Sequence, residues 1–85
     1  MSKKKQIEKN LELSNKLALY LMDNPQELNK VPSGVEYIIF SASDKKLNDE
    51  NQTVLDSLLK KGEKVVKAIQ TKDKSRPWDL NVLSV

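Results

Sequence analysis

Residues 35–42 read VEYIIFSA, and residues 64–71 read KVVKAIQT. The four consecutive apolar residues Tyr37 to Phe40 are typical of a strand that is covered on both faces, as in a parallel sheet. We therefore expect strands over 35–42 and 64–71, joined by a helix into a β-α-β unit. Lys67 lies inside the second strand and favours an edge position for it, since a charge at an edge blocks unwanted pairing.

The segment between the two strands has the apolar spacing of a helix. It ends at Lys60-Lys61-Gly62, where lysines suit the carboxyl end of a helix and glycine suits the left-handed position after it. Either Asp44 or Asp49 caps its start, and the spacing does not choose between them. The apolar face consists of Leu47, Val54, Leu55, Leu58 and Leu59.

Upstream, residues 6–23 predict a long helix after a basic start at residues 1–5, which either frays or forms a first exposed turn. Its apolar residues form two neighbouring stripes that together cover about 200° of the circumference, where an ordinary surface helix needs about 100°. A small sheet cannot cover so wide an arc. One stripe holds Ile7, Leu11, Ala18 and Met22, and the other holds Leu13, Leu17, Tyr20 and Leu21.

A short second helix is predicted over residues 24–30, because Asn24 can cap, Pro25 suits the first turn and Glu27 suits a capping box. We expect Leu28 and Val31 to turn inward from it, before residues 32–34 break the chain.

Beyond the second strand, residues 71–85 are either a third strand, with alternation over 80–85, or a tail exchanged with a neighbouring chain. The expected fold is α/β and comprises one domain, residues 1–85. It has a long N-terminal helix, a short helix, and a β-α-β unit with a small two- to three-stranded sheet.

Three short motifs carry a resemblance to a known family: Asn10-Leu11-Glu12-Leu13-Ser14, Asn24-Pro25, and Pro32-Ser33-Gly34 before an apolar strand. With them the chain resembles a family of short uncharacterised prokaryotic proteins over about residues 6–70. The family has no assigned function and no known catalytic residues, so the resemblance implies nothing about function. The segment from Thr71 onward lies outside the resemblance.

The composition argues against catalysis. The chain has no histidine, no cysteine and only two glycines, so imidazole, thiolate and glycine-lined phosphate chemistry lack their usual residues. Ser41, Ser43 and Asp44 follow the first strand, where a ligand would sit in a β-α-β unit, but without a glycine we interpret them as helix caps. We expect no enzyme, no cofactor and no metal site.

Function is expected to reside in the surplus apolar arc of the long helix. We predict a non-catalytic interaction or accessory module that forms a homodimer, or binds another protein, through Leu13, Leu17, Tyr20 and Leu21. Trp78 is either a contact anchor or a plug of the core. Ser14, Asn10 and Asn15 lie near the same arc, where they either fix the register of packed helices or are simply exposed.

The alternative function is nucleic-acid binding by a loose basic series near Trp78, interrupted by acidic residues: Lys60, Lys61, Lys64, Lys72, Lys74 and Arg76. The net charge of +3 is spread over both halves of the chain. A chain without cysteine suits a reducing compartment, and no apolar run approaches the roughly 18 residues that a membrane span needs. We expect a cytoplasmic protein with no membrane contact.

Overall fold

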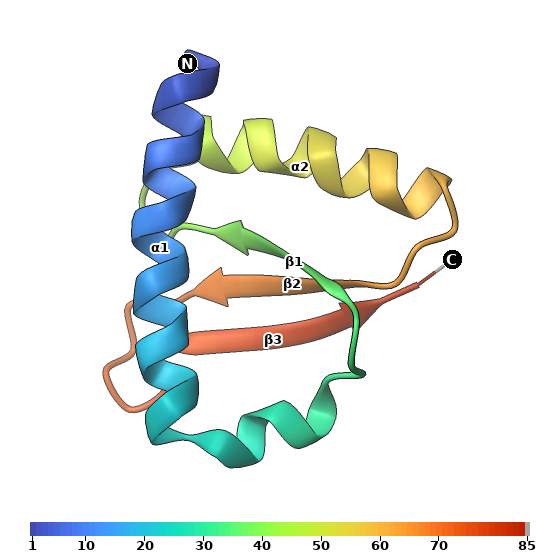
Figure 1. Cartoon of the computed structure of the whole chain (residues 1–85). Helices are drawn as coiled ribbons and strands as arrows, with labels where there is room; N and C mark the ends of the chain where they lie inside the picture. The colour runs from blue at the N-terminus through green and yellow to red at the C-terminus, as the bar shows by residue number, and fades with distance from the viewer. Residues whose placement is uncertain (85) are drawn as a thin grey trace.

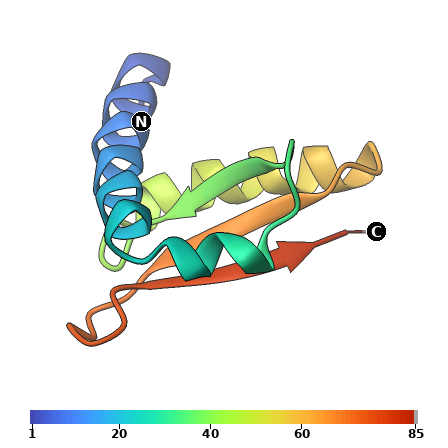
Figure 2. The same ribbon diagram turned by 60° about the horizontal axis from the view of Figure 1, so that its bottom comes forward.

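The computed structural model describes residues 1–84 of the chain. A three-stranded sheet lies between two helical layers (Figures 1 and 2), which confirms the predicted α/β fold. In chain order the elements are α1 (Lys3–Asp23), the 3₁₀ helix η1 (Pro25–Lys30), β1 (Glu36–Phe40), α2 (Lys45–Lys60), β2 (Val65–Gln70) and β3 (Trp78–Leu83).

The strands follow one another across the sheet in the order β1-β2-β3. β1 and β2 are parallel, with Glu36 opposite Val65, as the β-α-β prediction requires. β3 runs antiparallel to β2, with Gln70 opposite Trp78. The segment after residue 70 therefore pairs within its own chain as a third strand, two residues earlier than the alternation predicted, and Val85 lies outside the described residues.

Alternation along the strands divides the apolar side chains between the two faces of the sheet. On one face, Ile39, Ala68 and Trp78 pack against α1. On the other, Phe40 and Val65 pack against Leu55 of α2. This arrangement confirms that β1 is covered on both faces, and it places α1 across the carboxyl ends of β1 and β2 (Figure 1).

The position of Lys67 contradicts the edge prediction, because β2 is the central strand. The tail supplies β3 and so covers the second side of β2. Lys67 is accommodated because its ammonium group lies 4.6 Å from the centre of the Phe40 ring. A long aliphatic stem can cross an apolar face while a cation–π contact holds its charged end.

The helix ends decide one alternative and correct two expectations. Lys3 to Lys5 form the first exposed turn of α1, where the Ser2 hydroxyl accepts from the Lys5 N–H at 3.2 Å. Asn24 does not cap η1 but donates from Nδ2 to the Tyr20 carbonyl at 2.9 Å. Leu28 is 45% exposed instead of turning inward, because the six-residue 3₁₀ helix η1 does not bring it against the sheet.

Candidate protein interface

One of the two apolar stripes of α1 belongs to the core of the chain itself. Leu13 and Leu17 are 8% and 5% exposed, and Tyr20 and Leu21 pack partly buried against the same cluster. Trp78 is 4% exposed, so it is a core residue. Three of the five residues predicted for an interface are thus covered by the fold, and Tyr20 and Leu21 offer only part of their surface.

The second stripe of α1 faces solvent. Ile7 is 61% exposed, Leu11 62% and Met22 76%, and Ala18 between them is also exposed. At 100° per residue these four positions fall within about 60° of helix circumference, so they form one continuous face. We call them the outer stripe. The spacing predicted this stripe as well, but we expected the interface on the other one. The position of the sheet, which the spacing does not show, decides which stripe is covered.

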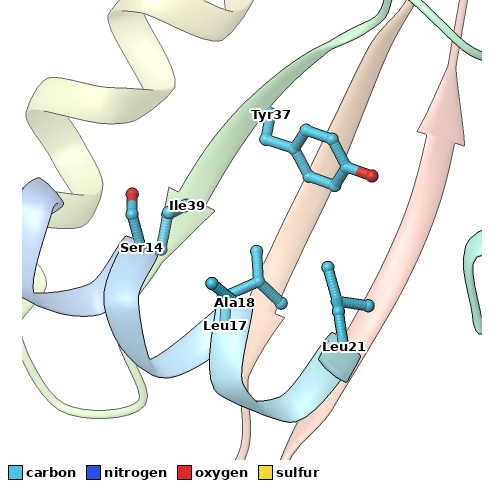
Figure 3. Close-up of a pocket in the computed structure, with 6 residues that line it drawn as sticks. All are labelled: Ser14, Leu17, Ala18, Leu21, Tyr37 and Ile39. Atoms are coloured by element: carbon cyan, nitrogen blue, oxygen red, sulfur yellow. The ribbon is translucent and has the colours of Figure 1, made fainter. Parts of the chain in front are cut away.

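An apolar hollow of about 290 Å³ adjoins the outer stripe, between α1 and the edge strand β1. In Figure 3 the lining residues Ser14, Leu17, Ala18 and Leu21 come from α1, and Tyr37 and Ile39 come from β1. The sequence carried no signal of this hollow, because its lining residues on α1 and on β1 are 16 or more positions apart in the chain. It extends the apolar surface from the helix onto the sheet.

Three carboxamides hold α1 in place against α2 and β1. Asn51 of α2 is 3% exposed and donates to the Ile39 carbonyl and to Asn10 Oδ1, both at 2.8 Å. Its own Oδ1 accepts from Gln6 at 3.0 Å and from Asn10 at 3.2 Å. Asn10 therefore fixes the register between two helices of the same chain. A buried network with every partner present specifies one geometry, so the outer stripe is presented on a fixed helix.

The charges of α1 oppose its own dipole. Lys3, Lys4 and Lys5 occupy the amino-terminal turn, and Asp23 is the last residue of the helix. Because a helix dipole favours anions at the amino end and cations at the carboxyl end, both ends of α1 carry unfavourable charges. An external carboxylate near Lys3 to Lys5 would relieve this arrangement.

The carboxyl end of α1 is tied to η1 by a small polar chain. The Tyr20 hydroxyl donates to Glu27 at 3.0 Å, and Lys30 pairs with the same carboxylate at 3.2 Å. Burial, and then the hydrogen bond to Glu27, raise the pKa of Tyr20. The hydrogen bonds from Lys30 and from Tyr20 lower the pKa of Glu27. Both the ring and the hydroxyl of Tyr20 therefore make contacts within the chain.

Of the polar residues after β1 that were predicted to be helix caps, only Asp44 caps α2. Its Oδ1 accepts from the Leu47 N–H at 3.1 Å, and its Oδ2 pairs with Lys9 at 2.6 Å. The bonds from Lys9 and from Leu47 lower the pKa of Asp44. The Ser41 hydroxyl accepts from the N–H groups of Ser43 and Asp44, both at 3.1 Å.

The fold separates the six basic residues of the alternative function into two groups. Lys60, Lys61 and Lys64 lie around the connection from α2 to β2, whereas the other three lie in the loop from β2 to β3 (Figure 1). β2 spans six residues, so the groups are about 20 Å apart at opposite ends of the sheet. They do not form one continuous basic surface with Trp78, which is buried.

Two features are absent from the part of the chain that the structure describes, a membrane-spanning helix and a cluster of metal ligands. Among residues 1–84, no helix combines the length and the apolar composition that crossing a bilayer requires. Within the same residues, no three carboxylates gather closely enough to hold a metal ion.

Comparison with known proteins matches the chain to a family model. No curated protein and no solved structure shows significant similarity to the chain. A model of a family of unknown function, DUF5647, matches residues 5–80. This match extends past residue 70, where the resemblance noted in the sequence ended, and it includes the start of β3. The chain therefore belongs to this family of unknown function, DUF5647.

Proposed function

We propose that this protein is a non-catalytic interaction module that self-associates through the outer stripe of α1. The observation that carries the proposal is the exposure of Ile7, Leu11 and Met22, each more than 60% accessible on a single helix face. Single exposed apolar residues are ordinary, but a contiguous apolar patch marks a contact surface. Here the patch continues into the apolar hollow beside Tyr37.

The rigidity of α1 supports a role in contact. The Asn51 network and the buried Leu13 and Leu17 hold the helix on both sides of its inward face. A partner that binds the outer stripe would therefore not have to order the helix first. Binding costs less free energy when the contacting element is already held in its bound conformation.

The polar groups at the strand ends also favour contact over catalysis. The side chains of Ser41, Asp44 and Asn48 are hydrogen-bonded to backbone groups, and Asp44 also pairs with Lys9. A catalytic carboxylate needs free access to a substrate, whereas Asp44 is held by a cap and an ion pair. We place the module in the reducing cytoplasm, the setting that a chain without cysteine suits.

A second copy of the chain is the partner we propose, because each end of α1 carries the charge that the other end lacks. Lys3 to Lys5 would meet Asp23 of another copy, which no partner of uniform charge would satisfy at both ends. Self-association is also a common way for a chain of this size to add buried apolar surface.

The test is absolute mass in solution, measured by light scattering over a dilution series. We expect twice the chain mass of 9.7 kDa at high concentration and a fall toward 9.7 kDa on dilution. A mass of 9.7 kDa at every concentration would refute self-association. Retention on DNA or RNA at low salt, lost as salt rises, would point instead to the basic residues.

A further inference from the structure

The shape of the outer stripe and the charges at the two ends of α1 favour one orientation for a pair of copies. Resting on the proposed self-association, we propose that two copies pair their α1 helices antiparallel about a twofold axis that passes between Ser14 and Asn15. Leu11 of each copy then lies over Ala18 of the other and enters the apolar hollow beside it. Ile7 of each copy lies over Met22 of the other.

The spacing of the stripe fits this axis. Ile7 and Met22 are equally far from the midpoint between Ser14 and Asn15, and so are Leu11 and Ala18. In a twofold interface the same patch serves both copies, so residues must match in reciprocal pairs. In an antiparallel pair about this midpoint, every apolar residue of the outer stripe meets an apolar residue of the other copy.

The shape of the surface fits as well. The amino-terminal half of the stripe projects, with Ile7 and Leu11 both more than 60% exposed. In the carboxyl-terminal half Met22 also projects, at 76% exposed, but the stripe is recessed at Ala18, which is small and lies on the rim of the hollow. An apolar cavity of about 150 Å³ accommodates benzene, so a hollow of about 290 Å³ has room for a leucine side chain. At the contact between Leu11 and Ala18, each copy thus supplies one projection and one recess.

The charges select the same orientation. The antiparallel arrangement brings Asp23 of one copy to the amino-terminal turn of the other, beside Lys3, Lys4 and Lys5. This contact places a carboxylate at the positive end of a helix dipole and lysines near a negative end. A parallel arrangement would gather six lysines at one end of the pair and would leave both dipoles side by side in the same direction.

Cysteine cross-linking tests the orientation, since the chain has no cysteine of its own. Three single variants are needed: Ile7→Cys, Met22→Cys and, as a control at an exposed site off the stripe, Leu19→Cys. In the antiparallel pair, position 7 of one copy lies beside position 22 of the other. It is about 22 Å, measured along the helix axis, from position 7 of the other copy. A mixture of the first two variants should form a covalent dimer under mild oxidation, and each variant alone should not exceed the Leu19→Cys background.

The outcomes separate this inference from the proposed function. Efficient cross-linking of Ile7→Cys with itself would show a parallel pair and overturn the antiparallel geometry, while self-association would stand. A dimeric mass without cross-linking above the control, alone or mixed, would show that another face is used and would overturn both the geometry and the assigned stripe. A monomeric mass of every variant and of the unaltered chain would overturn self-association itself.

Discussion

Replacing Leu11 by alanine tests the proposed interface most directly, because the chain contains its own control. Leu11 and Leu19 lie on the same helix and have the same exposed fraction, 62%. Leu11 belongs to the outer stripe, whereas Leu19 lies about 80° away around the helix. Leu11→Ala and Leu19→Ala therefore change helix propensity and exposed apolar area equally, and differ only in their relation to the interface.

The expected effect follows from the area that Leu11 still exposes. Truncation to alanine removes three carbon groups, worth about 0.8 kcal/mol each when fully buried. Scaled by the 62% that remains exposed in the single chain, the loss is about 1.5 kcal/mol per copy. A twofold interface contains the residue twice, so the dimer loses about 3 kcal/mol, or about 100-fold in Kd.

The assay is the dilution series of mass, by light scattering or sedimentation, for the unaltered chain and both variants. We expect the midpoint of dissociation to rise about 100-fold for Leu11→Ala and to stay within a few-fold for Leu19→Ala. Urea unfolding at high dilution should be nearly the same for both variants. Equal dissociation midpoints for the two variants would refute the assignment of the outer stripe.

Three further outcomes follow from the buried face and the caps. Leu17→Ala, at a core position that is 5% exposed, should lower the free energy of unfolding by about 2–5 kcal/mol in urea titrations, and a loss below that of an exposed site would contradict its place in the core. Asn51→Ala removes the side-chain donor of the Ile39 carbonyl and should lower the free energy of unfolding by about 1–3 kcal/mol in the same titrations. An unchanged free energy of unfolding would show that the network does not stabilise the fold. The lowered pKa of Asp44 means that its stabilising effect is present above the unfolded-state pKa, near 3.9, and is lost as the pH falls through the lower folded-state pKa. Thermal unfolding from about pH 6 to pH 3 should therefore show a steeper loss for the unaltered chain than for Asp44→Asn, and parallel profiles would count against the pairing with Lys9.

The elements with strong local patterns were predicted well from the sequence. The apolar run Tyr37 to Phe40 indicated a strand covered on both faces, and β1 is such a strand. Gly62 after two lysines marked the end of α2, and its φ of 79° lies in the region that glycine adopts without strain. The predictions were wrong where a side chain has more than one possible hydrogen-bond partner. Asn24 is an example, since its side chain donates to the Tyr20 carbonyl instead of capping η1.

An interface on α1 is still a prediction, but the residues on which we now place it differ from those that the sequence indicated. The wide apolar arc of α1 was evident from the spacing, and so was the surplus over what a small sheet covers. Leu13 and Leu17 were assigned to the interface, yet they are in the core, and the exposed residues are those of the outer stripe. The hollow beside Tyr37 left no signal in the sequence, because its two walls come from elements that meet only in the folded chain.

The sequence by itself determined the order of helices and strands, their approximate ends, and the presence of more apolar surface on α1 than one chain needs. These properties depend on backbone periodicity and on caps, which act over a few residues. Only the tertiary structure decided which stripe of α1 is buried, that β2 rather than an edge strand carries Lys67, and that the basic residues separate to opposite ends of the sheet. Each of these depends on which distant segments pack together, because burial is a property of the assembled layers and not of any single segment.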